Sequence, residues 1–224
     1  LLGRPRLRLR ADHRKFCPPL QATYLAMLGY SDRINHALAF AAKHHDQQVR
    51  KGTRLPYVTR AANVAVILTR YACDETTVVA GILQDVVDDY LRDGWTRAML
   101  EARLGEKFGA DVLDVTVAAA RRRLDDDGNE FDREERNVDY LARLGAAPDA
   151  SRWVCAADHV HWGNALLADL RRTVDAPVVW ARQPGGREAV VAWFQAVHER
   201  LVSVGFHAPI MNELGDTVRA LAAA

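Results

Sequence analysis

The chain has 224 residues, of which 49% are hydrophobic and 26% are charged, and its formal net charge is +1. This composition is typical of one globular domain with a sizeable core. The balanced charge argues against nucleic acid or a membrane surface as a partner. No apolar run approaches the roughly 18 residues of a membrane span. Cys17, Cys73 and Cys155 lie far apart, which predicts no disulfide framework or zinc site and favours the cytoplasm.

The first thirty residues form a basic arm that we expect to be partly disordered. They lack the apolar stretch of a secretory signal. We expect one domain over residues 31–205, and a C-terminal helix over residues 206–224 that packs on the same domain. The basic side chains of the arm, which face the single acid Asp12, are Arg4, Arg6, Arg8, Arg10, Arg14 and Lys15.

Helical periodicity dominates the rest of the chain. Behind Ser31, a candidate N-cap, apolar residues recur at steps of three and four up to His45. We found no convincing strand pattern there, so the prediction is an all-α bundle of about eight to ten helices. Further helices are predicted at about 57–71, 74–89, 96–108, 110–123, 132–144, 149–173, 187–204 and 208–222.

His45 ends the first apolar helix face and runs into a basic turn that contains Arg50 and Lys51. A histidine on such a face is most often a core residue with one hydrogen-bond partner, and a basic turn is most often solvated. Arginine and lysine beside a glycine turn also suit phosphate oxygens, which they bind by charge-assisted hydrogen bonds. The combination therefore indicates a candidate phosphate site.

Three carboxylates, from Asp85, Asp88 and Asp89, share one face at the end of a predicted helix. Each like-charge pair costs about 0.2–0.5 kcal/mol, and the helix dipole adds about 0.3–1 kcal/mol for each anion there. A bound cation, or a cationic group of a ligand, would remove this conflict. The ordinary alternative is an acidic helix end in water.

Asp158 lies on a largely apolar helix face, so its carboxylate needs a partner. A salt bridge is the ordinary answer, and a metal ion is the more specific one. His45, Asp85 and Asp158 come from three separate predicted helices. One imidazole and two carboxylates suit Mn²⁺, Fe²⁺ or Zn²⁺.

These motifs, from about residue 31 to residue 201, resemble the HD metal-dependent phosphohydrolases. The similar branch is that of the bacterial small alarmone hydrolases and the hydrolase domains of RelA/SpoT enzymes, which cleave (p)ppGpp in the stringent response. The residues that match the pattern of this family are Ala42, His45, Gln48, Arg50, Lys51, Pro56, Tyr57, Asp85, Asp89, Ala157, Asp158 and His161.

The resemblance implies an HD-domain helical bundle that hydrolyses the 3′-pyrophosphate of (p)ppGpp or of a related phosphorylated nucleotide. It implies one Mn²⁺, or another divalent metal, as cofactor. The implied catalytic residues are Asp88 and Asp89. The implied substrate-binding residues are Arg50, Lys51, His161 and Trp162, and the implied metal ligands are His45, Gln84, Asp85 and Asp158.

The chain departs from the family pattern at the site itself. Gln84 replaces a histidine ligand, Arg60 stands where a histidine usually follows, Asp88 replaces a glutamate, and Trp162 replaces an asparagine. An amide oxygen is a weak ligand for a transition metal. Three hypotheses remain: a (p)ppGpp hydrolase, a hydrolase of another phosphorylated molecule, and a catalytically impaired nucleotide-binding or interaction protein. Metal content separates the last from the others.

Overall fold

The computed structural model describes residues 29–50, 53–88, 96–173 and 175–224, with the side chain of Asp88 outside the description. Within these ranges there are ten helices and no β-sheet, which confirms the all-α prediction. Most of the predicted basic arm lies outside the described residues. The helices are α2 (Asp32–His44), α3 (Val58–Arg70), α4 (Glu75–Asp88), α5 (Arg97–Phe108), α6 (Ala110–Ala119), α7 (Arg133–Ala146), α8 (Asp149–Arg172), α9 (Ala176–Ala181), α10 (Gly186–Ser203) and α11 (Ile210–Ala223).

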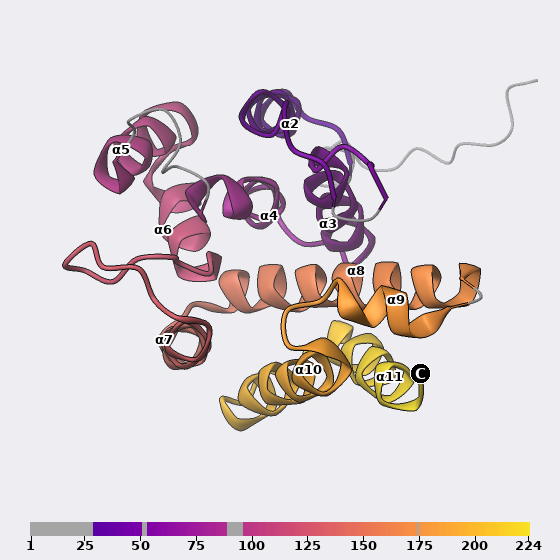
Figure 1. Cartoon of the computed structure of the whole chain (residues 1–224). Helices are drawn as coiled ribbons and strands as arrows, with labels where there is room; N and C mark the ends of the chain where they lie inside the picture. The colour runs from indigo at the N-terminus through magenta and orange to yellow at the C-terminus, as the bar shows by residue number, and fades with distance from the viewer. Residues whose placement is uncertain (1–28, 51–52, 89–95, 174) are drawn as a thin grey trace, which may run out of the picture.

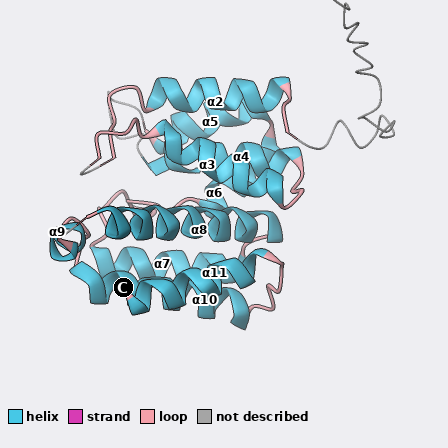
Figure 2. Ribbon diagram, turned by 90° about the vertical axis from the view of Figure 1, so that its right-hand side faces the viewer, coloured by secondary structure: helices cyan, strands magenta, loops and turns pink. Residues whose placement is uncertain are grey.

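The long helix α8 is the centre of the fold. It lies between α2 to α6 on one side and α7, α10 and α11 on the other (Figures 1 and 2), and it packs directly against α3, α4, α6 and α11. Residues 154–160 are all buried. Because seven consecutive residues cover almost two helical turns, every face of α8 is covered here. No helix in the described part of the chain is long and apolar enough to cross a membrane.

Several helices begin where the sequence predicts. The Ser31 hydroxyl accepts a hydrogen bond from the backbone N–H of Ile34 at 3.1 Å, which confirms the predicted N-cap of α2. α7 begins with a capping box, in which Asp132 and Glu135 satisfy each other's backbone N–H groups. These helix starts depend on residues three apart in the chain, which is why the sequence reveals them.

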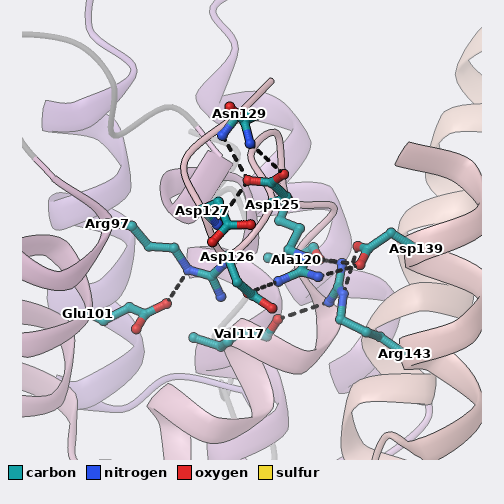
Figure 3. A network of polar contacts seen from close by, with 11 residues as sticks. Arg97, Glu101, Val117, Ala120, Asp125, Asp126, Asp127, Asn129, Asp139 and Arg143 are labelled. Carbon is teal, nitrogen blue, oxygen red and sulfur yellow. Dashed lines mark hydrogen bonds and ion pairs between the residues drawn. The ribbon is translucent and has the colours of Figure 1, made fainter. Parts of the chain in front are cut away.

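The end of α6 differs from its predicted position. The helix stops at Ala119, four residues before the predicted end, and Ala120 has an extended backbone. Arg143 of α7 donates hydrogen bonds to the carbonyl groups of Val117 (3.4 Å) and Ala120 (2.9 Å), and it also pairs with Asp139 (Figure 3). The side chain of Arg143 in α7 therefore caps the C-terminal end of α6. The three arginines at 121–123 consequently lie in the connection to α7.

The short helix α9 was missing from the prediction. It has six residues, with Pro177 in its first turn, where a missing N–H costs little. Val179 and Trp180 are its buried residues, and it contacts α8 and α10. A helix of fewer than two turns shows no readable period and is stable through its packing. This explains why the sequence pattern did not predict it.

Gly163 permits the close approach of α8 to the C-terminal helices. A Cβ atom at this position would lie 2.2 Å from Cγ2 of Thr217 and 3.0 Å from the Phe194 ring. We predict that Gly163→Ala lowers the free energy of unfolding by about 1–3 kcal/mol, because overpacking outweighs the better helix propensity of alanine. Chemical denaturation measures this loss. The matched control is Gly105→Ala, whose Cβ would meet only the flexible Leu113 side chain at 3.3 Å; equal losses would contradict the prediction.

Candidate functional site

One guanidinium group joins three helices at the centre of the candidate site. Arg60 of α3 donates through Nε and Nη2 to the two carboxylate oxygens of Asp158 on α8, at 2.8 and 2.6 Å. Its Nε also lies 3.2 Å from Oδ2 of Asp85 on α4. Its Nη1 donates to the Tyr57 hydroxyl at 3.1 Å. The two carboxylates predicted as metal ligands are therefore brought together, and an arginine lies between them.

The environment of this cluster favours its charged form. The side chain of Asp158 is 9% exposed and that of Asp85 is 16% exposed. Burial alone would lower the pKa of Arg60, but the charges of Asp158 and Asp85 raise this pKa well above its ordinary value. Burial would raise the pKa of Asp158, yet the charge and hydrogen bonds of Arg60 lower it. Arg60 and Asp158 are therefore both charged around neutral pH, and the guanidinium also faces the carboxylate of Asp85.

The cluster borders two adjoining cavities, which share Tyr57, Arg60 and Trp162 as lining residues. The second cavity, of about 960 Å³, includes Arg50 and His161 in its lining. The first has a volume of about 490 Å³ and is lined by Tyr57, Arg60, Gln84, Asp85, Ala119, Ala120, Arg121, Arg123, Glu130, Arg136, Tyr140, Asp158, His159, Trp162 and Trp193.

His45, the predicted imidazole ligand, is buried at the end of α2 with 1% exposure. Its Nδ1 lies 2.8 Å from Oε1 of Gln48, which can only accept, so the ring donates there and its Nε2 is an acceptor. The ring also packs on Tyr57, with centroids 4.9 Å apart. His45 is not among the side chains that line the two cavities.

The described side chains do not fit a resident divalent metal. Arg60 engages both oxygens of Asp158 and one oxygen of Asp85. Gln84 is buried, and within the described part of the chain its amide Nε2 has no hydrogen-bond partner. No three His, Cys, Asp or Glu side chains among the described residues are grouped so that they could hold a metal ion. Two of the four predicted ligands, Asp85 and Asp158, therefore have the guanidinium of Arg60 between them, and the four-ligand set as a whole stays a prediction.

The predicted substrate-binding residues are divided between the two cavities. Arg50 pairs with Asp169 of α8 at 2.7 Å, and both line the second cavity together with His161. Trp162 lines both cavities. The predicted residues Lys51 and Asp89 and the side chain of Asp88 lie outside the described residues.

Sequence reasoning missed several residues that line the first cavity. Arg121 and Arg123 come from the connection after α6, and Arg136 comes from α7. Tyr140 and Trp193 are the missed aromatic residues, and the Arg121 guanidinium lies 4.8 Å from the centre of the Trp193 ring. The run of three arginines at 121–123 was a visible signal. Its importance was hidden because this segment was predicted as helix.

His159 is a buried neutral histidine beside this cavity. Trp193 donates its ring N–H to Nε2 of His159 at 3.1 Å, so this nitrogen must be the acceptor. The proton is therefore on Nδ1, which donates to the backbone carbonyl of Cys155 at 2.8 Å. Burial lowers the pKa of His159, because the charged ring would lose its hydration. His159 is thus a structural link between α8 and α10.

Comparison with known proteins places this architecture in a family. A family model described as HD domain matches residues 37–162, which is more than half of the chain. The chain therefore belongs to the HD-domain family. The match begins in α2 and ends within α8, so it includes α3, α4 and the part of α8 that carries Asp158.

Curated relatives extend the comparison to named enzymes. A GTP pyrophosphokinase of Myxococcus xanthus is 27% identical over 113 residues, which cover 50% of this chain and 14% of that protein. A guanosine-3′,5′-bis(diphosphate) 3′-pyrophosphohydrolase of Aquifex aeolicus is 32% identical over 87 residues, which cover 39% of this chain and 12% of that protein. The chain thus corresponds to a small part of the length of these relatives.

Solved structures share the fold. A structure described as a metazoan ortholog of SpoT that hydrolyses ppGpp matches with a TM-score of 0.65 and 23% identity, over 85% of this chain and 96% of that chain. A protein of Listeria monocytogenes matches with a TM-score of 0.59 and 20% identity, over 74% of this chain and 99% of that chain. These likenesses confirm the predicted HD-type fold.

We predict that Arg60→Met destabilises the protein by about 3–5 kcal/mol, because the buried carboxylate of Asp158 and the partly buried carboxylate of Asp85 lose their cation. Urea denaturation measures the free energy of unfolding. The matched control is Arg70→Met on the same helix, which removes an exposed pair with Glu213 and should cost only about 0–1 kcal/mol. Similar losses in both variants would show that the Arg60 bridge contributes no more than a surface ion pair.

We also predict that stability falls as the pH drops below about 6.5, the ordinary pKa of histidine. The folded protein keeps His159 neutral, whereas the unfolded chain binds the proton, so acid favours unfolding until the folded-state pKa is reached. His161, whose pKa burial also lowers, acts in the same direction. Denaturation midpoints between pH 8 and pH 5 should therefore decline less in His159→Gln than in the wild type. An unchanged slope in the variant would contradict this account.

Proposed function

We propose that this chain binds a guanosine polyphosphate of the (p)ppGpp class, or a related phosphorylated nucleotide, in the two adjoining cavities. Membership of the HD-domain family and a relative named as a 3′-pyrophosphohydrolase support this class of ligand. The observation that carries the proposal is that the cavities meet at Tyr57, Arg60 and Trp162, with further arginines on both sides. Aromatic rings suit a base, and arginines suit phosphate groups.

The chemistry of the lining explains how such a ligand could be held. Trp162 lines both cavities and packs against the tilted ring of Phe194, with centroids 4.9 Å apart, so Phe194 supports the indole. A base on its other face would gain stacking energy without ordering a mobile side chain. The amide Nε2 of Gln84 can donate to an acceptor oxygen of the ligand, which would satisfy a buried donor.

Metal-dependent hydrolysis of the 3′-pyrophosphate is the second candidate function. In this reaction water cleaves (p)ppGpp to GDP or GTP and pyrophosphate. The retention of His45, Asp85 and Asp158 favours it, as does the relative named for this activity. Against it, both carboxylates are engaged by Arg60, which would have to release them before they could bind a metal. The geometry therefore supports nucleotide binding better than turnover.

Calorimetric titration with ppGpp tests the binding proposal. We expect ppGpp to bind the purified chain more tightly than GDP, because GDP lacks the 3′-pyrophosphate. Trp162→Ala should weaken ppGpp binding by about 1–3 kcal/mol through lost stacking. The matched control is Trp162→Phe, which keeps an aromatic face and should retain most of the affinity.

Three outcomes would overturn this assignment. Absence of ppGpp binding to a folded wild-type protein would refute the class of ligand. Chromatography would detect any pyrophosphate that is released from ppGpp in the presence of Mn²⁺. Such release would favour the hydrolase over the binding protein. Trp162→Ala with unchanged affinity would show that the nucleotide lies elsewhere.

A further inference from the structure

Arg60 provides a positive charge between Asp85 and Asp158 in the first cavity. The family pattern has a histidine there, and another histidine at the position of Gln84. In this chain the guanidinium contacts both carboxylates that the family pattern assigns to the metal. We infer that Arg60 replaces the divalent cation and makes the site independent of metal.

The geometry of the bridge supports this replacement. Nε and Nη2 of Arg60 form a bidentate pair with Asp158, and Nε also faces Asp85. Nη1 is held by the Tyr57 hydroxyl. All three guanidinium nitrogens therefore have protein partners, and the planar fork is held in one orientation. Arginine remains charged at every pH at which the protein is folded, so this cation is permanent.

The substitution at Gln84 belongs to the same change. A histidine there would add a metal ligand, and a bound divalent metal would lie beside the guanidinium, where like charges repel. Glutamine is neutral and lines the same cavity as Arg60. The substitutions at positions 60 and 84 therefore fit a single change, in which the guanidinium of Arg60 took the place of the divalent metal ion. The amide Nε2 of Gln84 is also left as a donor for a ligand, because it is buried and has no hydrogen-bond partner among the described residues.

Independence from metal would be a further property of the proposed nucleotide site. It rests on the proposed function only for the identity of the nucleotide. The inference itself concerns the cavity and Mn²⁺ alone. Its test therefore uses no nucleotide, so that failure of nucleotide binding and failure of metal independence are distinguishable results.

The first experiment compares the wild type with the double variant Arg60→His/Gln84→His. Each protein is equilibrated with Mn²⁺, and bound metal and melting temperature are measured with and without a chelator. We expect the wild type to retain no stoichiometric Mn²⁺ and to melt at the same temperature in both conditions. The double variant should retain about one Mn²⁺ per chain and melt several degrees higher with metal, because a ligand that binds only the folded state stabilises it.

A second measurement keeps the inference testable if the double variant does not fold. Arg60→Ala should melt lower than the wild type and should regain several degrees in the presence of methylguanidinium, which can re-enter between Asp85 and Asp158. Mn²⁺ should also raise its melting temperature, because the two carboxylates are then exposed to the ion. The matched control is Arg70→Ala, which lies on the same helix and should respond to neither cation.

Three results would overturn the inference. The wild type could bind one Mn²⁺ per chain tightly, which would show that Arg60 yields to the metal. Arg60→Ala could melt at the same temperature as the wild type, which would show that the guanidinium is not needed to neutralise Asp85 and Asp158. Arg60→Ala could also be destabilised yet respond to neither methylguanidinium nor Mn²⁺, which would show that Arg60 acts through packing alone.

Discussion

The fold around the cavities depends on the neutralisation of two carboxylates, Asp85 and Asp158, that lie inside the helical bundle. A buried carboxylate without a partner costs several kcal/mol, so each sequence that keeps these acids must also supply a cation. Here Arg60 supplies it through a bidentate contact and a second ion pair. Because the three residues come from α3, α4 and α8, the same contact sets how these helices meet.

This bridge also determines the chemistry available to the site. A divalent metal would offer open coordination positions and would lower the pKa of a bound water. A guanidinium offers only N–H donors, and each of the three nitrogens of Arg60 already donates to a protein oxygen. The chain shares the HD-domain architecture, but the function of a fold depends on the residues of its site. Gln84 and Trp162 further change the donors and the shape of the same cavity.

The residues of the candidate site were predictable from the sequence to a considerable extent. The apolar helix neighbours of Asp158 predict that it faces inward, with a salt bridge or a metal as its partner, and the structure shows the salt bridge. The sequence motifs also include Gln84, Asp85 and Trp162, which line the same cavity. The partner of Asp158 was not predictable, because Arg60 is 98 positions away in the chain. Periodicity relates residues within a helix, not between helices.

The sequence by itself determined the all-α class and the starts of helices such as α2 and α7, because caps and apolar periods are local properties. It also identified the HD-domain motifs, since these are short patterns of residues. Only the tertiary structure decided where α6 ends, because Arg143 of another helix caps it. The tertiary structure likewise decided which cation lies between Asp85 and Asp158. Charge pairing between helices depends on distances in space, and these distances cannot be read from the spacing of residues along the chain.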